Sequence, residues 1–404
     1  MRVSIVGGGI GGLTAAVALA RKGVEVAVFE QAAGPSRAGA SLDLGPNATR
    51  LLDALDLGAA REVGVRPDAI ELLRWDDGST LLRAPHGPPA EEHFGAPLLD
   101  FYRSDLHDVL LGALPPGAVR FGIRVHAVEQ DGGQAEVVLC DGTRVASDAV
   151  VAADGIRSAL RQQLVGADEP VFSGTVVYRG LADKAAVEDL HPDRVNRYWL
   201  GPNRHAVVYW IASGDLLAIN AAIRDAEWAR ESWTDEAPPE EVLPAFEGWH
   251  EPLLERFRRC RLFLRGAVFV RRPLEHWSFG RVTLLGDAAH AMEPFQAQGA
   301  AQAIEDAFVL GECLDGVSSA DVAEALTRYE QVRMERAQEM QDSSRAAADT
   351  LYLPDGPLQR ERDERYRTLL DTYPWGHRQP LWEHDVRAAF GSERGFRSRE
   401  RQGP

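Results

Sequence analysis

Short, mostly apolar runs, each ending close to a glycine, recur at three distant places in the chain. They occupy residues 3–6, 149–153 and 282–285. Continuous apolar runs of this length are typical of strands that are buried on both faces, as in a parallel sheet covered by helices. The pattern therefore predicts one parallel sheet, assembled from segments that lie far apart in the sequence.

Strand-like segments separated by turn residues mark a second kind of sheet. They cover residues 175–181, 195–200, 206–212 and 216–222, and residues 70–82 alternate around a turn in the manner of a hairpin. Regular strands joined by short turns predict an antiparallel sheet. Helices are expected at residues 11–21, 48–55, 104–114, 299–314 and 320–351.

The two patterns interleave along the chain, which predicts a discontinuous organisation. Residues 1–68, 98–170 and 278–351 are expected to form a nucleotide-binding α/β domain. Residues 69–97 and 171–277 are expected to form an inserted substrate-binding domain, and residues 352–404 a C-terminal helical segment and tail. A chain of 404 residues is long enough for two such domains.

Composition and charge narrow the class of protein. With 45% hydrophobic and 26% charged residues, the chain has the composition of a soluble globular protein. The net charge of −17 argues against a nucleic-acid or anionic-membrane partner. The three cysteines lie far apart without metal-ligand spacing, so we expect no metal site and a reducing compartment. No membrane span or signal peptide is recognisable, so we expect a cytoplasmic protein, either a monomer or a homodimer.

The N-terminal strand leads into a glycine motif. Gly7, Gly9 and Gly12 have G-x-G-x-x-G spacing, between a strand and a helix. Gly7 permits a tight turn, Gly9 lets the backbone approach a pyrophosphate, and Gly12 lets the helix pack on the strand. Glu30 ends the next strand, where its carboxylate can accept the ribose hydroxyls. This motif predicts a site for FAD or NAD and leaves the choice between them open.

The other two apolar runs also end beside an acid and a glycine, in Asp154-Gly155 and Gly286-Asp287. Gly155 permits a close backbone approach, and the Asp287 carboxylate can accept hydrogen bonds from a polyol chain. Either motif alone is also compatible with an ordinary strand-to-helix connection.

A loop marked by Pro294 follows the third motif and reaches Gly299, which opens a helix of small residues. The N-terminus of that helix can stabilise the electron-rich edge of a reduced flavin.

Together, the three motifs resemble those of the single-component FAD-dependent aromatic hydroxylases, the para-hydroxybenzoate hydroxylase-like or group A flavin monooxygenases. The resemblance covers residues 1–351. It implies an α/β fold, in which a glutathione-reductase-type FAD-binding Rossmann domain carries an inserted antiparallel β-sheet substrate domain and C-terminal helices. The cofactor-binding residues that it implies are Gly7, Gly9, Ile10, Gly11, Gly12, Glu30, Arg37, Arg103, Asp154, Gly155, Gly286, Asp287, Pro294, Gly299 and Ala300.

The resemblance also implies roles for some of these residues. Arg103 is expected to contact the FAD diphosphate and ribityl region, and Asp287 to hold the ribityl chain. Asp154 and Gly155 are expected to serve both FAD and a transiently bound nicotinamide cofactor. Pro294 resembles the proline that lines the oxygen-reacting face of the flavin.

The activity implied is that of an FAD-dependent monooxygenase that hydroxylates a small aromatic or heteroaromatic substrate. NADH or NADPH reduces the flavin, O₂ is the co-substrate, and a flavin C4a-hydroperoxide delivers the hydroxyl group. The chain lacks a second G-x-G-x-x-G motif, which fits transient docking of the nicotinamide cofactor. The sequence does not distinguish NADH from NADPH as the electron donor.

Residues 200–209 and 298–307 are most similar to salicylate hydroxylase and 6-hydroxynicotinate 3-monooxygenase. In those relatives a histidine and a tyrosine four residues apart on a substrate-domain strand face the ligand. His205 and Tyr209 match this pair, and positions i and i+4 of a strand share one face. With Pro294, they are the expected catalytic residues, although a structural role for both stays open.

One departure from the resemblance concerns the substrate. Many salicylate-type relatives have a histidine after the proline, whereas this chain has Phe295. An apolar ring there weakens the case for an anionic ligand, so a neutral indole or phenol stays open beside an aromatic acid. Arg179 and Arg204 are the candidate anion binders if the substrate is an acid.

Two other functions stay open at this point. The first is a flavin-dependent epoxidase, oxidative-cyclisation enzyme or indole or phenol oxygenase of secondary metabolism on the same scaffold. The second is an FAD-binding protein without oxygenase activity, such as a reductase or sensor.

Overall fold

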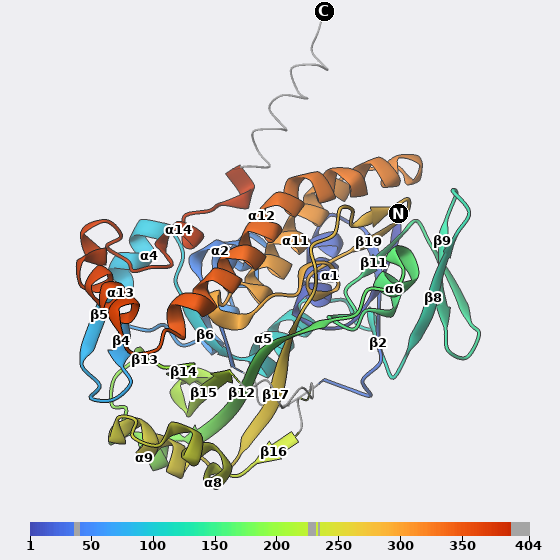
Figure 1. Cartoon of the computed structure of the whole chain (residues 1–404). Coiled ribbons are helices and arrows are strands. Elements are labelled where there is room, and N and C mark those ends of the chain that lie inside the picture. Colours follow the sequence, from blue (N-terminus) through green and yellow to red (C-terminus); the bar gives the residue numbers. More distant parts are fainter. Residues whose placement is uncertain (36–40, 225–231, 233–234, 389–404) are drawn as a thin grey trace, which may run out of the picture.

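The computed structural model describes residues 1–35, 41–224, 232 and 235–388. Its architecture is α/β, with two large sheets set against each other and long helices along one side (Figure 1). The remaining residues lie outside the described part, and among them is Arg37, one of the predicted cofactor-binding residues.

The first sheet contains all three apolar runs. Its strand order is β18 (Ser278–Phe279), β19 (Val282–Leu284), β11 (Ala149–Ala152), β1 (Arg2–Val6), β2 (Glu25–Glu30) and β7 (Val119–Phe121). The pairs from β19 to β7 are parallel, whereas β18 and β19 are antiparallel. The parallel pairing brings the ends of β1, β11 and β19 to one edge, and each of these ends carries one of the glycine motifs.

Helices and a small sheet enclose the first sheet. α1 (Ile10–Arg21) packs against α11 (Gly299–Leu314), which in turn packs against α12 (Val322–Leu351). Gly311 permits the close approach of α1 and α11, because a Cβ atom there would lie 3.0 Å from Ala18. The small sheet has the order β10 (Arg144–Ser147), β9 (Ala135–Leu139) and β8 (Val125–Gln130), and its apolar residues join the same core.

Within the part of the chain that the structure describes, the second large sheet has eight strands. Their order is β16 (Asp235–Ala237), β17 (Phe263–Val270), β12 (Val171–Asp183), β15 (Leu216–Arg224), β14 (Arg204–Ile211), β13 (Val195–Gly201), β4 (Ala69–Arg74) and β5 (Thr80–Pro85). Every neighbouring pair is antiparallel, as predicted, except β4 and β13, which run parallel. That exception arises because β4 enters the sheet from an earlier segment of the chain.

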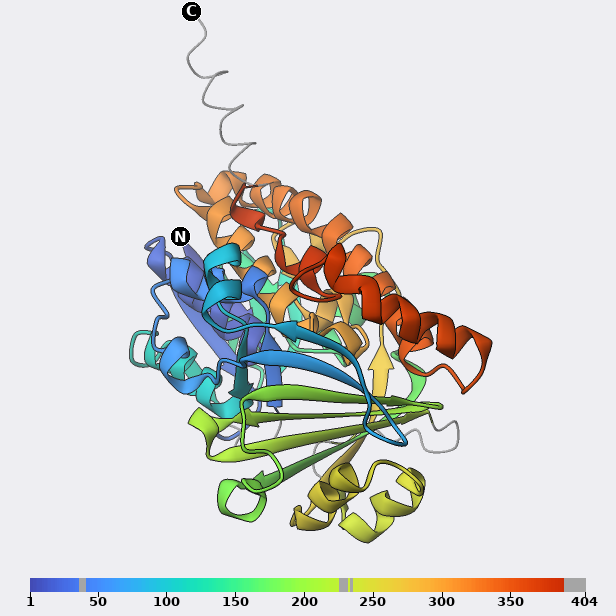
Figure 2. The same cartoon turned by 90° about the vertical axis from the view of Figure 1, so that its left-hand side faces the viewer.

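Different elements cover the two faces of this sheet. α8 (Pro239–Val242) and α9 (Glu251–Arg259) pack on one face through a cluster that includes Trp199, Trp210 and Phe257 (olive helices in Figure 2). The opposite face points toward the first sheet and the C-terminal helices (Figure 2). It carries Tyr198, Val207 and Tyr209, because side chains alternate along each strand.

Residues 352–388 form a segment that folds back over the second sheet, hereafter the C-terminal segment. It contains α13 (Pro357–Thr368), η5 (Leu369–Asp371) and α14 (Gln379–Trp382). Its Tyr366 and Trp382 pack in one apolar cluster with Leu72 and Leu82 of the hairpin formed by β4 and β5.

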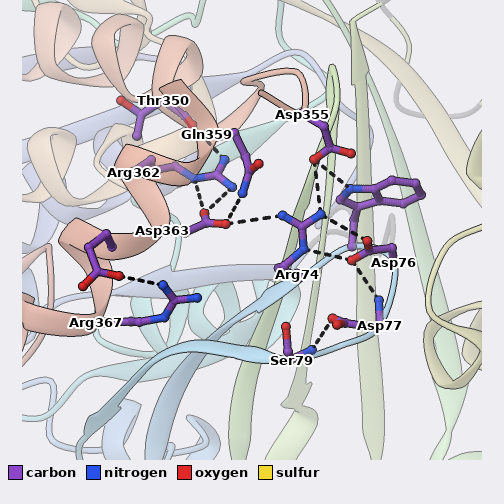
Figure 3. Close-up of polar contacts among 12 residues, drawn as sticks. Arg74, Asp76, Asp77, Ser79, Thr350, Asp355, Gln359, Arg362, Asp363 and Arg367 are labelled. Atoms are coloured by element: carbon purple, nitrogen blue, oxygen red, sulfur yellow. Dashed lines mark hydrogen bonds and ion pairs between the residues drawn. The ribbon is translucent and has the colours of Figure 1, made fainter. Parts of the chain in front are cut away.

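Arg74 at the end of β4 ties the C-terminal segment to that hairpin. Its guanidinium pairs with Asp355 at 3.2 Å and with Asp363 at 3.4 Å, and also with Asp76 of its own turn (Figure 3). Asp363 in addition accepts hydrogen bonds from Gln359 and Arg362 (Figure 3). The polar cluster therefore fixes α13 on the edge of the sheet.

The other elements are mostly short connections. They are β3 (Ser41–Leu44), β6 (Leu99–Tyr102), α2 (Pro46–Ala54), α3 (Ala60–Val63), α4 (Pro88–Phe94), α5 (Arg103–Gly112), α6 (Ala159–Val165), α7 (Lys184–Val187), α10 (Asp287–His290), η1 (Ala212–Gly214), η2 (Leu243–Phe246), η3 (Pro294–Gln296) and η4 (Ser319–Asp321). β3 and β6 pair as a two-stranded antiparallel ribbon.

Candidate active site

A cavity of about 850 Å³ runs from the edge of the first sheet to the inner face of the second. It brings together fourteen of the residues predicted from the sequence: Gly9, Ile10, Gly11, Arg103, Gly155, Gly286, Asp287, Pro294, Gly299, Ala300, Arg179, His205, Tyr209 and Phe295. Gly7, Gly12, Glu30, Asp154 and Arg204 do not line it. One continuous space therefore joins the predicted cofactor residues to the predicted substrate residues.

The three glycines of the motif after β1 have different surroundings: two are packed closely against the backbone, and the third borders open space. A Cβ atom at Gly7 would lie 2.2 Å from the Ala153 carbonyl oxygen, and one at Gly12 would lie 2.0 Å from the Gly7 carbonyl oxygen. At Gly9 the nearest atom of the described residues, Nη2 of Arg103, would be 4.0 Å away, and this position faces the cavity. The first two glycines thus serve the turn and the packing of the helix, while Gly9 leaves the room that a dinucleotide diphosphate requires.

The Glu30 carboxylate lies at the end of β2 beside this motif. It accepts hydrogen bonds from the backbone N–H groups of Gly8 and Ala32, both at 2.7 Å. These bonds orient the carboxylate next to the glycine turn, where the adenosine ribose lies in dinucleotide-binding folds. Its role as a ribose ligand stays a prediction.

Arg103 and Asp287 line the middle of the cavity from different segments. Arg103 begins α5, and Asp287 begins α10 directly after β19. Burial lowers the pKa of Arg103, and the negative charges of Asp287 and Glu30 oppose that shift. A cation and an exposed carboxylate on the wall of one cleft suit a ligand with phosphate groups at one end and hydroxyl groups beside them.

A buried ionic network supports the loop that carries Asp287. The Asp306 carboxylate accepts a hydrogen bond from the Gly286 N–H at 3.1 Å and lies 2.6 Å from Nε2 of His290. Arg333 of α12 bonds Asp306 at 2.9 Å and Glu305 at 2.8 Å. Burial alone would raise the pKa of Asp306, but His290 and Arg333 hold it below its ordinary value. His290 therefore belongs to the scaffold of the loop and does not line the cavity.

The floor of the cavity is the inner face of the second sheet. Strand register places Arg179, Asn220, Val207 and Tyr198 side by side across β12, β15, β14 and β13. His205 and Tyr209 lie on either side of Val207 along β14, and both line the cavity. The expectation that this pair shares one face thus follows from the alternation of the strand.

His205 is a neutral imidazole in this setting. Burial, together with the charge of Arg378, lowers the pKa of His205 to about 4. Its ring packs against Phe295 and Tyr352, with ring centres 5.6 Å and 5.4 Å away. A neutral ring nitrogen can either donate or accept a hydrogen bond, depending on the tautomer.

Tyr209 belongs to a polar chain that includes β3. Its hydroxyl group donates to the Ser41 hydroxyl at 2.8 Å, which also accepts a bond from Asn220 at 3.1 Å. Burial raises the pKa of Tyr209 well above its ordinary value, and the nearby Asp43 and Asp100 act in the same direction. The phenol group is therefore an oriented, neutral hydrogen-bonding group.

Arg179 is the cation of the cavity floor. Its guanidinium lies over Gly266 of β17, where a Cβ atom would come within 3.3 Å of Nη1. Burial lowers the pKa of Arg179 to about 10, so that the side chain is still charged at neutral pH. A partly buried, charged guanidinium in a cavity can bind an anionic group of a ligand through paired hydrogen bonds.

The sequence did not single out several residues that line the cavity. They are Ser41 and Asp43 on β3, Tyr198 and Asn220 on the floor, and Tyr366, Tyr373, His377 and Arg378 of the C-terminal segment. Their sequence signal is strand alternation, which places Ser41 and Asp43 on one face of β3 and gives Tyr198 and Asn220 a face in two of the predicted strands. Nothing in the local sequence of the C-terminal segment indicates that it reaches the cavity.

Glu293, directly before Pro294, separates the cavity from a smaller one of about 240 Å³ and lines both. Glu293 is only 9% exposed, and its Oε2 atom has no hydrogen-bond partner among the described residues. Burial raises the pKa of Glu293 to about 7, although Arg345 and Arg224 oppose the shift.

We expect Glu293→Gln to stabilise the protein above pH 7 and to have little effect below pH 4.5. In the wild type the folded state retains the proton between pH 4.5 and 7, whereas the unfolded state releases it, so stability declines across this window. The gain at pH 8 should be about 2 kcal/mol, since one pKa unit corresponds to about 1.4 kcal/mol and solvent screens part of the shift. Urea unfolding at pH 5 and pH 8 measures this gain in the free energy of unfolding.

Glu339→Gln, at a side chain 59% exposed, is the control and should give no pH-dependent difference. Equal stabilisation at both pH values would contradict the expectation.

Comparison with known proteins gives a consistent picture. The family model described as "FAD binding domain" matches residues 1–344. The 3-amino-4-hydroxybenzoate 2-monooxygenase PtmB3 of Streptomyces platensis is 43% identical over 377 residues, which cover 93% of this chain and 95% of the relative. The 6-hydroxynicotinate 3-monooxygenase of Bordetella bronchiseptica is 33% identical, over 87% of this chain and 92% of the relative.

A solved structure of a salicylate hydroxylase substrate complex is similar with a TM-score of 0.81 and 28% identity, and the match covers 96% of both chains. None of the helices among the described residues combines the length and the apolar character needed to cross a lipid bilayer.

Proposed function

Because this chain belongs to the FAD-binding-domain family of aromatic-ring monooxygenases, we propose that its substrate is a small aromatic acid with a ring hydroxyl group and an amino group. The protein is an FAD-dependent monooxygenase, and NAD(P)H and O₂ are its co-substrates. Hydroxylation of an aromatic ring is confirmed as its reaction, and the relatives do not favour an epoxidase or a flavoprotein without oxygenase activity.

The proposed substrate class is supported by Arg179 above all. This partly buried guanidinium lines the floor of the cavity together with Tyr209. The most direct comparison is 3-amino-4-hydroxybenzoate, on which a relative 43% identical to this chain acts. Phe295, which by itself weakens the case for an anionic ligand, packs on His205 and forms an apolar wall. We infer that Arg179 binds the carboxylate and that the wall excludes water from the ring.

The residues of the cavity suit the positions that such a reaction needs. FAD, when bound along Gly9, Arg103 and Asp287, supplies the electron transfer from NAD(P)H and the activation of O₂. The neutral His205 can accept a hydrogen bond from a ring hydroxyl group, and the Tyr209–Ser41 pair fixes a hydrogen bond beside it. Arg179 and the apolar wall orient the ring, and the apolar wall excludes water from the site of the reaction.

We expect Arg179→Gln to raise the KM for an aromatic acid by about 100-fold, since a charge-assisted, bidentate contact is worth about 3 kcal/mol. FAD content should be unchanged because Arg179 lies at the substrate end of the cavity. Substrate-stimulated NAD(P)H oxidation measures KM for 3-amino-4-hydroxybenzoate, with 2-aminophenol and indole as ligands without a carboxylate.

Arg204→Gln is the matched control, because Arg204 lies on the same sheet but does not line the cavity. It should retain the wild-type KM. If indole or 2-aminophenol stimulated NAD(P)H oxidation and the aromatic acid did not, the proposal of an acidic substrate would be contradicted. An unchanged KM in Arg179→Gln would show that this residue does not bind the substrate.

Three further expectations stay proposals. We propose the division into a discontinuous FAD-binding domain, an inserted substrate-binding domain and a C-terminal segment at the boundaries given above. We also propose a cytoplasmic protein that acts as a monomer or a homodimer. Its net charge of −17 supports the absence of a nucleic-acid partner.

A further inference from the structure

We propose that Asp43 is a specificity-determining residue, which binds the amino group of the substrate at the end of the cavity remote from Arg179. This inference rests on the proposed function, because it needs an aromatic acid bound at Arg179. The sequence motifs of the family do not include Asp43. The inference depends on where the fold places this residue.

Asp43 reaches the cavity from the ribbon of β3 and β6. It lies opposite Asp100 in the antiparallel register of the two strands. Asp43 is only 8% exposed, yet it lines the cavity. Asp100 is fully buried, does not line the cavity and accepts a hydrogen bond from Asn196 at 2.9 Å. Burial and the neighbouring Asp43 raise the pKa of Asp100 well above its ordinary value.

The contacts of Asp43 leave one oxygen for a ligand. Oδ2 accepts hydrogen bonds from Nη1 of Arg378 at 3.0 Å and from the Tyr198 hydroxyl at 3.4 Å. Arg378 also donates to the Tyr198 hydroxyl at 2.9 Å, which closes a triangle. Oδ1 has no partner among the described residues. A carboxylate oxygen inside a cavity is stabilised by an N–H or O–H donor, and a charge-assisted bond is about twice as strong as a neutral one.

Arg378 fixes the carboxylate without blocking that oxygen. Arg378 is 3% exposed and comes from the C-terminal segment, beyond residue 344, where the family match ends. The segment is held by the Arg74 cluster described above, in which Asp363 of α13 pairs with Arg74 (Figure 3). Asp43 is thus pinned in one orientation before any ligand arrives, which is what a selective hydrogen bond requires.

The two ends of the cavity match the two ends of the proposed substrate. Tyr198, the neighbour of Asp43, and Arg179 lie three strands apart in the same row of the sheet. At the usual strand spacing this separates their Cα atoms by roughly 14 Å. A benzoate ring with its carboxylate toward Arg179 and a hydrogen-bond donor toward Asp43 spans this row. Val207, between them, offers an apolar surface for the ring.

The histidines at this end offer a hydrogen-bond donor only an uncharged acceptor. Burial lowers the pKa of His205 to about 4 and the pKa of His377 to about 3, so both are neutral at physiological pH. Of the cavity-lining side chains around Tyr198, only Asp43 carries a negative charge among the described residues. The geometry therefore assigns donor recognition to Asp43.

The test compares ligand binding to the FAD-loaded protein, followed by the change in flavin absorbance without NAD(P)H. The ligands are 3-amino-4-hydroxybenzoate and 4-hydroxy-3-methylbenzoate, in which a methyl group of similar size replaces the amino group. We expect the wild type to prefer the amino compound by about tenfold or more, because the methyl group leaves the Asp43 oxygen without a partner.

In Asp43→Asn this preference should fall to about twofold, because a neutral amide is a weaker acceptor than a carboxylate. Asp355→Asn is the control: it changes a half-exposed acid of the Arg74 cluster outside the cavity and should retain the wild-type preference. Wild-type preference in Asp43→Asn would overturn the inference.

The ligand pair keeps the test decisive if Asp43→Asn does not fold. Equal affinity of the wild type for both ligands would by itself overturn the role of Asp43. Failure of the inference is distinct from failure of the proposed function. In the first case both acids bind with equal affinity, and in the second case neither binds and Arg179→Gln has no effect.

Discussion

Gly9→Val is expected to give a folded protein that no longer retains FAD. Among the described residues, a Cβ atom at Gly9 would meet nothing closer than Arg103 Nη2 at 4.0 Å, and the backbone there, at φ −76° and ψ −177°, suits any residue. The valine side chain would instead fill the space beside Arg103 that the diphosphate needs. We expect the affinity for FAD to fall by on the order of 1000-fold, equivalent to about 4 kcal/mol. Fluorescence titration of the apoprotein with FAD measures this change.

Gly12→Val is the matched comparison, three residues along the same motif. Its Cβ atom would lie 2.0 Å from the Gly7 carbonyl oxygen, so the substitution disrupts the packing of α1 on β1. We expect that variant to lose its cooperative unfolding transition, whereas Gly9→Val should keep it with a loss of about 1 kcal/mol from the poorer helix cap. If the Gly9→Val protein folded and bound a full complement of FAD, the prediction that this turn binds the FAD diphosphate would be refuted.

Arg333→Met should destabilise the protein by about 4 kcal/mol, because removing one partner of a buried ion pair leaves uncompensated charge. Arg333, Glu305 and Asp306 are all fully buried, and one guanidinium serves both carboxylates. Asp306 also holds the Gly286 N–H, so we expect weaker FAD binding as well. Urea unfolding of the apoprotein gives the stability, and an FAD titration gives the binding.

Arg367→Met provides the comparison for an exposed pair. Arg367 is 55% exposed and pairs with Glu364 one helical turn away, a contact worth at most about 0.5 kcal/mol (Figure 3). Stability losses of similar size in the two variants would show that the Arg333 network does not carry the loop of Gly286 and Asp287.

The sequence predicted the elements whose signals are local. The apolar runs at β1, β11 and β19 and the glycines behind them follow from burial and from backbone geometry alone. The fold class, FAD as cofactor and the aromatic-ring monooxygenase reaction are confirmed. The individual roles of His205 and Tyr209 stay predictions, although both line the cavity.

The sequence could not reveal contacts that depend on distant pairing. Asp43 and Arg378 lie 335 positions apart, and neither has a local pattern that indicates a buried ion pair. No helix was expected at α4, because its short Pro- and Gly-flanked stretch lacks helical periodicity. The parallel pairing of β4 with β13 was missed because neighbouring strands in a turn-rich sequence suggest hairpins.

The order of strands in the first sheet has a consequence for biosynthesis. β11 must wait for β19, about 130 residues later in the chain, before its second edge is paired. Until the ribosome has released that segment, the nascent chain exposes an apolar strand edge, which is a template for intermolecular association. Expression at low temperature, or with a chaperone that shields such edges, should therefore raise the yield of native protein more than it does for a protein built from local hairpins.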